Sequence, residues 1–451
     1  MPANLLNGIV VDNCKDCTLQ RMKGIAMGIL IQDVLAVLPE GARTVSIFIK
    51  GNRIENIGDF RTEASYDEII DGRGRLAVPG LVNAHAHTYM TALRNYADDL
   101  PFDTWLFDRV MPAEESLTPE EAYWSSSLAC LEMLRGGITS FLDMHMFPGA
   151  ACRAAIETGM RAVVSRGLSG GADDIEGGKR RLREAVAEFH EYRDNERLTF
   201  MLAPHALYTC DEGYLREIAD KARELGLGIN THIAEGKSEI RGSLEKYGLT
   251  PFQVYDRCGL LGESTIAAHC VHMTDADIEL MRERGASVAL NPFSNLKLAN
   301  GVARVPDMLR AGINLCLGTD SSASNNSLSI LRELQITATL HKGLTGNPEA
   351  VTASESFKMA TVNGARALGL RDVGELRGGM MADIAIFDVS TPGMTPLGDP
   401  LSALAYSSAG LQAETVIVDG EIALRCGEYK KADTERILYE TNAIGKRLNR
   451  G

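Results

Sequence analysis

Hydrophobic residues recur in short runs through the middle of the chain. Runs rich in Val, Ile and Leu alternate there with stretches of helical periodicity, which is typical of βαβ units around a buried parallel sheet. Eight such runs lie at residues 81–87, 138–144, 161–167, 200–207, 228–235, 265–272, 287–292 and 314–320. Because eight parallel strands close a barrel, the pattern predicts an α/β fold, a (β/α)8 TIM-type barrel.

The first long helix of this region has local signals at both ends. Thr118 can cap its start, Pro119 suits the first helical position and Glu121 can complete a capping box. Gly136 and Gly137 follow the apolar periodicity and mark the end of the helix. We therefore expect a helix between the first and second barrel strands.

The two chain ends carry a second kind of pattern. Residues 45–57, 382–388 and 414–424 read as strands separated by turns that contain glycine. They predict a small composite β-sandwich built from both ends. The expected division is residues 1–79 and 374–451, with a C-terminal helix, for the sandwich and residues 80–373 for the barrel. Residues 1–25 are weakly patterned and receive no role.

Composition limits the class of partner. The chain of 451 residues is 45% hydrophobic and 24% charged, which suits a folded globular protein, and its formal net charge is −14. Nucleic-acid binding relies on clustered Lys and Arg, so we expect a small-molecule partner. No run is long enough for a membrane span, and the first residues lack a secretory pattern. The expected location is cytoplasmic.

Cysteine usage gives no sign of a disulfide framework. The nine cysteines are an odd number scattered over a long chain, which favours reduced thiols. Cys14 and Cys17 form a CxxC motif, but no second pair or nearby histidine completes a four-ligand zinc site. We interpret these two cysteines as bystanders.

Titratable residues gather where the predicted strands end. Five of the nine histidines fall at or near strand C-termini, and so do two carboxylates; the seven residues are His85, His87, His205, His232, His269, Glu235 and Asp320. The C-terminal end of the strands is where active sites form in such barrels. The strand map therefore predicts that these side chains converge at one mouth.

A metal site follows from this convergence. Strand alternation places His85 and His87 on the same face, although in isolation the pair could equally be two polar residues at a strand end. His232 and Asp320 add ligands from the fifth and eighth strands. The nitrogen and oxygen donors suit one divalent ion, Zn²⁺ first, with Fe²⁺ or Mn²⁺ as alternatives.

The remaining groups suit hydrolysis. An ion in such a site makes a water molecule nucleophilic near neutral pH. Asp320 can accept a proton, His269 can orient the nucleophile or stabilise developing charge, and Glu235 can act as a general acid and base. His145 is a candidate for lining the pocket. The remaining histidines are expected to be bystanders: His190, His272 and His341.

Several segments resemble one enzyme superfamily. PGLVNAHAHTYM, APHALYTC, HIAEGKSE, AAHCVHM, NPFSNLKLANG and LGTDSSASNN are similar, in order, to the metal-dependent amidohydrolases, and within them to 5′-methylthioadenosine and S-adenosylhomocysteine deaminases. The resemblance implies a one-metal barrel with a composite sandwich. It also implies His85, His87, His232 and Asp320 as ligands, and Glu235, His269 and Asp320 as the groups that move protons and position the water.

The same resemblance implies a substrate site. His205 would contact the substrate, and Glu114 would approach the ribose hydroxyls. Arg166 would meet the carboxylate of a larger substrate, with either Lys179 or Arg180 as a second cation. In the family this contact can cross a subunit boundary, so a homo-oligomer is expected.

The leading functional hypothesis is hydrolytic deamination of an adenine nucleoside. In this reaction hydroxide activated by the metal would attack C6 of the purine and release ammonia. The alternatives within the superfamily are deamination of a free purine such as guanine and hydrolysis of triazines. A cytidine-deaminase site would need HxE and PCxxC motifs, which the sequence lacks. A silent scaffold would have lost a ligand or proton carrier, and the sequence keeps them all.

Overall fold

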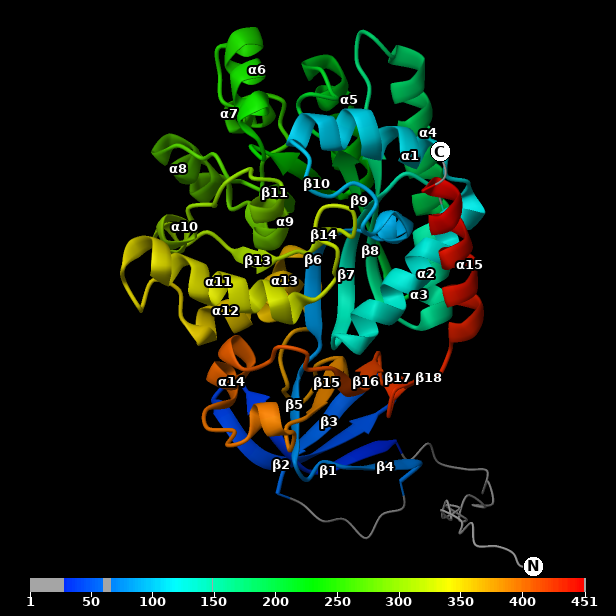
Figure 1. The fold of residues 1–451 in the computed structure, drawn as a ribbon, viewed down its shortest axis with the longest axis vertical. Coiled ribbons are helices and arrows are strands. Elements are labelled where there is room, and N and C mark those ends of the chain that lie inside the picture. Colours follow the sequence, from blue (N-terminus) through cyan, green and yellow to red (C-terminus); the bar gives the residue numbers. More distant parts are fainter. Residues whose placement is uncertain (1–27, 60–65, 148, 450–451) are drawn as a thin grey trace, which may run out of the picture.

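The computed structural model describes residues 28–59, 66–147 and 149–449 (Figure 1). These residues form a large α/β unit with a smaller β unit below it in the view of Figure 1. The weakly patterned residues 1–25, with Cys14 and Cys17, lie outside the described ranges.

The large unit is organised around a parallel sheet. Its order is β13-β12-β11-β10-β9-β8-β7-β6-β14. The strands are β6 (Leu81–His87), β7 (Ile138–His145), β8 (Arg161–Leu168), β9 (Leu198–Pro204), β10 (Gly228–Ile233), β11 (Thr265–His269), β12 (Ser287–Leu290), β13 (Leu315–Leu317) and β14 (Asp320–Ser321). The predicted parallel sheet is thus confirmed.

The eighth predicted strand is interrupted. Its first part, β13, pairs with β12, and its second part, β14, pairs with β6. Gly318 and Thr319 separate the two parts, and Thr319 donates its N–H to the carbonyl oxygen of His85 in β6. The two strands at opposite ends of the sheet order, β13 and β14, are therefore separated by only these two residues.

Helices follow the strands along the chain. They are α2 (Pro119–Arg135), α3 (Ala150–Thr158), α4 (Ile175–Tyr192), α5 (Glu212–Leu225), α6 (Lys237–Tyr247), α7 (Pro251–Arg257), α8 (Asp275–Arg284), α9 (Pro292–Lys297), α10 (Val305–Ala311), α11 (Ile330–Thr345), α12 (Ala353–Met359) and α13 (Val362–Ala367). The start of α2 has the predicted capping box, in which Thr118 and Glu121 bind each other's backbone N–H, and Gly136 is its C-cap. Both local signals are confirmed.

An insertion separates β6 from α2. It contains the 3-10 helix η1 (Thr88–Leu93), the π-helix η2 (Thr104–Val110) and the short helix α1 (Met111–Glu115). π-helical turns often occur at functional sites. The sequence pattern did not predict this insertion.

Both chain ends contribute to one further sheet, as predicted. Its order is β18-β17-β16-β15-β5-β1-β2-β3, with β4 paired to β1. The strands are β1 (Ile29–Leu38), β2 (Gly41–Lys50), β3 (Arg53–Gly58), β4 (Glu68–Asp71), β5 (Arg75–Pro79), β15 (Ile384–Asp388), β16 (Ala413–Val418), β17 (Glu421–Arg425) and β18 (Glu428–Tyr429). We call this the chain-end sheet.

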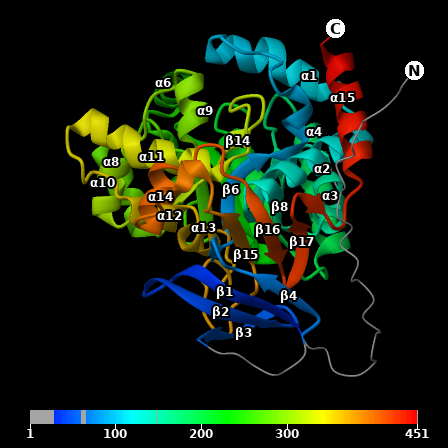
Figure 2. The same cartoon turned by 60° about the horizontal axis from the view of Figure 1, so that its bottom comes forward.

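The chain-end sheet has two buried faces. One covers a separate apolar core that includes Ile31, Ile47, Ile54 and Ile384. On the other face, side chains such as Phe387 join the core of the large unit. Figure 2 shows β15, β16 and β17 between the helices of the large unit and β1, β2 and β3. The chain ends therefore build a layer attached to the large unit through β15, β16 and β17.

A buried ion pair reinforces this junction. The guanidinium of Arg161, at the start of β8, contacts both carboxylate oxygens of Asp383 at 3.1 and 3.2 Å. It also reaches Asp419 at 3.1 Å, and Asp383 is fully buried. Truncating one partner of a buried pair leaves an uncompensated charge, so loss of Arg161 or Asp383 would leave an unpaired charge at the junction of the two units.

The C-terminal elements cover the large unit. The helix α14 (Pro400–Tyr406), which follows η3 (Pro392–Met394), packs on α11 and α12, and α15 (Thr434–Leu448) packs on α2. Thr441 in α15 donates to the carbonyl oxygen of Trp124, and Arg447 binds Glu121. Among the described residues, no helix is long and apolar enough to cross a membrane.

Candidate metal centre and active site

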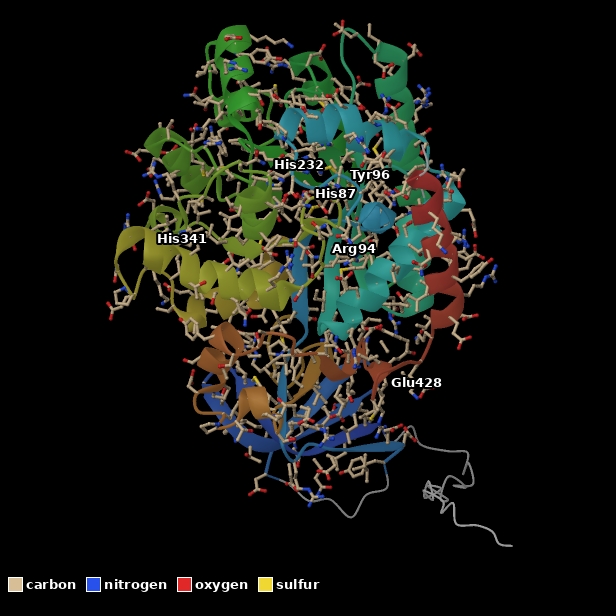
Figure 3. The ribbon with its side chains drawn as sticks, viewed as in Figure 1. His87, Arg94, Tyr96, His232, His341 and Glu428 are labelled. Atoms are coloured by element: carbon tan, nitrogen blue, oxygen red, sulfur yellow. The ribbon has the colours of Figure 1, made fainter. Side chains whose placement is uncertain are left out.

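The predicted metal ligands come together at the C-terminal ends of strands of the parallel sheet. His85 and His87 end β6, His232 lies near the end of β10, and Asp320 begins β14. All four side chains are buried. Figure 3 shows His87 and His232 at the end of the parallel sheet that lies opposite the chain-end sheet, whereas His341 lies away on α11. The rings of His87 and His232 are 5.3 Å apart.

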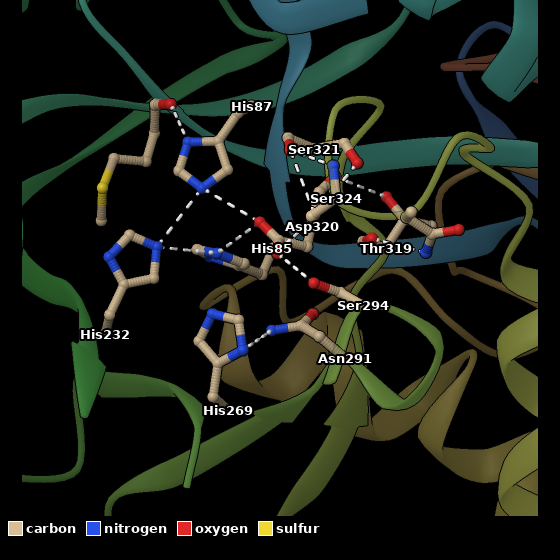
Figure 4. A network of polar contacts seen from close by, with 12 residues as sticks. His85, His87, His232, His269, Asn291, Ser294, Thr319, Asp320, Ser321 and Ser324 are labelled. Carbon is tan, nitrogen blue, oxygen red and sulfur yellow. Dashed lines mark hydrogen bonds and ion pairs between the residues drawn. The ribbon is translucent and has the colours of Figure 1, made fainter. Parts of the chain in front are cut away.

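The ligand atoms face one another closely (Figure 4). The Nε2 atom of His232 lies 3.2 Å from Nε2 of His85 and 3.3 Å from Nε2 of His87. Oδ1 of Asp320 lies 3.3 Å from Nε2 of His87 and 3.8 Å from Nε2 of His85. Tetrahedral zinc ligands bound at about 2.0–2.2 Å lie about 3.4 Å from one another. The four residues therefore fit a single divalent ion.

Neighbouring groups orient these ligands. Nδ1 of His87 lies 2.8 Å from the carbonyl oxygen of Met144, and Nδ1 of His232 lies 2.7 Å from that of His205. Each Nδ1 therefore carries the proton, which leaves the Nε2 lone pair for a metal. Asp320 accepts hydrogen bonds from Ser294 and Ser324 through Oδ2, so Oδ1 stays available.

Burial sets the charge of the site. It lowers the pKa of His85 and His232 well below the usual range, as do the neighbouring imidazoles. Burial raises the pKa of Asp320, but its hydrogen bond with His87 and the nearby His269 outweigh that effect and hold the pKa well below its usual range. Neutral His85 and His232 beside an ionised Asp320 have the protonation states that metal binding requires. At His87, burial lowers the pKa, but the contact with Asp320 outweighs burial and raises it.

The backbone is strained at three positions of this site. Ala234, His269 and Asp320 have φ values of 54°, 72° and 61°. These lie in the left-handed region, which non-glycine residues rarely adopt and which costs about 1–3 kcal/mol per residue. Such strain often accompanies a functional site, because the surrounding structure must impose it.

Glu235 and His269 form the second part of the site. Their side chains lie 3.8 Å apart, and Nδ1 of His269 contacts Oδ1 of Asn295 at 2.9 Å. Asn300 donates to Glu235 at 3.1 Å, and the backbone N–H of Glu235 donates to the buried Glu239 at 3.0 Å. Burial, followed by the charge of Asp320, raises the pKa of Glu235 to about 8. A carboxyl group in this range can both donate and accept a proton near neutral pH.

A pocket opens above these groups, and much of its wall is apolar. The wall comes mainly from η1, η2, α1 and the end of β7: Met90, Phe102, Trp105, Leu106, Val110, Met111, Met144 and Met146. The sequence analysis predicted none of these apolar residues as part of the site, although it did single out Glu114, which lies near them in α1. The signal was present as the aromatic and apolar run FDTWLFDRVM after the first strand.

Glu114 and His205, the two residues that the resemblance assigns to the substrate, both line this pocket. The hydroxyl of Tyr89 donates to Glu114 at 2.6 Å, and burial raises the pKa of Glu114 to about 7. Burial lowers the pKa of His205 to about 4, so this imidazole is neutral. His145 also lines the pocket and lies 3.3 Å from the buried Glu188.

The three predicted cations lie elsewhere. Arg166 is buried outside the pocket lining, where it binds Glu184 on α4 at 2.6 Å. Lys179 and Arg180 are exposed on α4 and lie near Glu176 and Glu184, respectively. His190, His272 and His341 are not among the lining residues. The structure thus brings the metal and proton-transfer residues together but not the cations.

Comparison with known proteins agrees with this geometry. Residues 76–423 match the model of the amidohydrolase family. The chain belongs to the amidohydrolase family. This amidohydrolase is 41% identical to a 5-methylthioadenosine/S-adenosylhomocysteine deaminase of Caldanaerobacter subterraneus subsp. tengcongensis, over 94% of this chain and 99% of the relative. It is 40% identical to a 5′-deoxyadenosine deaminase of Methanothermobacter thermautotrophicus, over 90% and 96%.

A solved structure extends the similarity to the whole fold. An adenosine deaminase from Xanthomonas campestris with bound zinc matches this amidohydrolase with a TM-score of 0.90 and 30% identity, over 94% of this chain and 99% of the other. The expected family and enzyme class are therefore confirmed, and the structure contains a histidine and aspartate group able to hold a metal.

Proposed function

We propose that this amidohydrolase is a metal-dependent hydrolytic deaminase of adenine nucleosides. The observation that carries the proposal is the buried set of His85, His87, His232 and Asp320 with Glu235 beside it. Relatives that cover most of the chain are named as deaminases of 5-methylthioadenosine, S-adenosylhomocysteine and 5′-deoxyadenosine. The proposed reaction adds one water at C6 of the purine and releases one ammonia.

The four ligands would hold one ion, with zinc as the first candidate because the similar adenosine deaminase contains it. When bound, a divalent ion supplies a nucleophilic water near neutral pH. The chain's own residues fix where that chemistry happens. Met144 and His205 hold the ligand imidazoles through their carbonyl groups, and the two serines hold Asp320.

Proton transfer is assigned to three residues. Asp320 accepts the proton of the attacking water, and His269 orients that water and stabilises the charge that develops. Glu235 delivers its proton to the ring nitrogen, and the proton taken up by Asp320 passes to the departing amine. The hydroxyl proton left on C6 then returns to Glu235 as the C6 carbonyl forms. Its raised pKa supports this role, because efficient general acids and bases titrate near the working pH.

Substrate recognition is assigned to the pocket wall. Glu114 would accept hydrogen bonds from ribose hydroxyls, and the neutral His205 would contact the purine. The apolar side chains of η2 and α1 would enclose the base and the 5′ group. A ligand carboxylate could reach Arg166 only if the ion pair with Glu184 opened, and the exposed Lys179 and Arg180 would need to fold inward.

The proposal extends to the architecture. The interrupted strand formed by β13 and β14 would count as the eighth strand of a closed (β/α)8 barrel. Residues 80–373 would form the barrel domain, and residues 1–79 and 374–451 the β domain with its C-terminal helix. A homo-oligomer is proposed as the assembly.

An ammonia-release screen tests the function. The metal-loaded protein would be assayed with methylthioadenosine, S-adenosylhomocysteine, 5′-deoxyadenosine, adenosine and guanine, and its metal content would be measured in parallel. We expect activity on at least one adenine nucleoside and about one ion per chain. Activity on guanine with none on any nucleoside would contradict the proposed substrate class.

A further inference from the structure

One buried cation lies directly behind the wall of the active-site pocket. Arg166 in β8 pairs in register with His145 in β7, which lines the pocket, and Gly167 and Ser169 beside it also line the pocket. Arg166 is 6% exposed. Its positive charge acts to lower the pKa of Tyr89 and of His145, which both line the pocket. Burial and nearby carboxylates nevertheless raise the pKa of Tyr89 overall, and at His145 burial lowers the pKa but nearby carboxylates outweigh it. The guanidinium is therefore within electrostatic reach of the wall that carries Glu114.

A carboxylate of the protein itself, that of Glu184, already binds this cation. Nε and Nη2 of Arg166 both donate to Oε2 of Glu184, at 3.0 and 2.6 Å. Glu184 comes from α4, and its other oxygen lies 3.6 Å from Nε of Arg180. Among the described residues, the buried Nη1 of Arg166 has no hydrogen-bond partner. Two of the three guanidinium nitrogens are thus committed, and the third keeps unused donor capacity.

The pocket itself offers no replacement for that cation. Its lining residues are mostly apolar or aromatic, together with histidines, serines, a threonine and the carboxylates Glu114, Glu235 and Asp320, and no Lys or Arg is among them. A ligand carboxylate placed there would be desolvated near carboxylates of the protein, which is costly without a paired cation. A small uncharged 5′ group would instead pack on the methionine and aromatic side chains of the wall.

We propose that Glu184 is a specificity-determining residue of this enzyme. By holding Arg166 behind the pocket wall, Glu184 makes the site select adenine nucleosides with an uncharged 5′ group over those whose 5′ group ends in a carboxylate. This inference rests on the proposed deaminase function. Removing the charge of Glu184 frees two guanidinium nitrogens, so a ligand carboxylate can take the place of Glu184.

Two nucleosides that differ in one terminal group provide the test. They are 5′-butylthio-5′-deoxyadenosine and its counterpart in which a carboxylate replaces the terminal methyl group. The measured quantity is the ratio of kcat/KM for the carboxylate to kcat/KM for the neutral nucleoside. Because both values come from the same preparation, this ratio does not depend on the fraction of folded protein.

We expect the metal-loaded wild type to favour the neutral nucleoside by at least about tenfold. Glu184→Gln raises the ratio by about tenfold or more, since a charge-assisted hydrogen bond contributes at least that factor. Glu184→Asp, which keeps the charge but shortens the side chain, gives a smaller rise. Arg166→Met and the double variant with Glu184→Gln give no rise, because the cation is then missing.

Glu191→Gln is the matched control, since Glu191 is an exposed carboxylate on the same helix, and it leaves the ratio unchanged. A wild-type ratio near one, or a ratio that Glu184→Gln and Glu184→Asp both leave unchanged, would overturn the assignment of Glu184 while the deaminase function stands. Absence of ammonia release from every adenine nucleoside would overturn the proposed function, and the role of Glu184 with it.

Discussion

The metal centre and the core of the chain-end sheet bury opposite kinds of side chain. In the chain-end sheet, the buried core is made of aliphatic side chains such as Ile31, Ile47 and Ile384 on paired strands. At the metal centre, histidines and carboxylates are buried, and His269 and Asp320 adopt left-handed backbone conformations.

This difference separates stability from function. The aliphatic core of the chain-end sheet agrees with local preferences, which is expected of a region selected for folding. The metal centre violates them, since burying charge and straining the backbone both cost free energy. Substitutions in the sheet should therefore change the free energy of unfolding, and those at the centre should change activity.

The largest effect is expected from Asp320→Ala. It removes a proposed ligand and a proton acceptor together, so the variant should lose the bound ion and fall to background activity. The measurements are metal content per chain and ammonia release. Asp194→Ala changes a carboxylate that is 97% exposed and should retain both. Full activity of a metal-free Asp320→Ala preparation would remove the metal assignment.

Glu235→Gln should have the next largest effect. The amide keeps the shape and the contact with Asn300 but cannot transfer a proton, so turnover should fall by about 10²–10⁴ with the metal content unchanged. The measurement is kcat beside metal analysis, with Glu245→Gln on the exposed face of α6 as control. An unchanged kcat would exclude Glu235 from proton transfer.

Ile47→Ala probes the other region. Ile47 is fully buried in the core of the chain-end sheet, and removing such a side chain costs about 2–5 kcal/mol of unfolding free energy. Below the unfolding transition kcat should stay at the wild-type value. Denaturant unfolding and ammonia release test both parts, and Ile69→Ala, at a site 54% exposed, should change neither. A large fall in kcat of folded Ile47→Ala would break the separation.

The smallest effect is expected from Glu114→Gln. Loss of a charge-assisted hydrogen bond to ribose should lower kcat/KM for adenine nucleosides by about 10- to 100-fold, equivalent to about 1.5–3 kcal/mol. Where the wild type has measurable activity on free adenine, the variant should keep that activity, because the free base has no ribose. Glu115→Gln alters the adjacent exposed carboxylate and serves as control. Equal losses on the base and the nucleosides would contradict ribose recognition.

Local sequence signals predicted much of the fold. The α2 capping box depends on residues three positions apart, and β6 has the predicted bounds, because both features are encoded over a few residues. The interruption between β13 and β14 was not predicted, since an apolar run cannot reveal where a strand changes partner. The η2 insertion was also not predicted. Its apolar side chains line a pocket formed with other segments, so its own sequence does not show what they pack against.

The sequence by itself determined which residues could bind a metal and at which strand ends they lie, because strand periodicity and chain order are local properties. Tertiary structure alone decided how those strand ends meet, with ring nitrogens 3.2–3.3 Å apart. It also decided that Arg166 is bound to Glu184 rather than exposed in the pocket. Distances between distant segments depend on how all the strands of the sheet are arranged and how α4 packs on it, which no short stretch of sequence encodes.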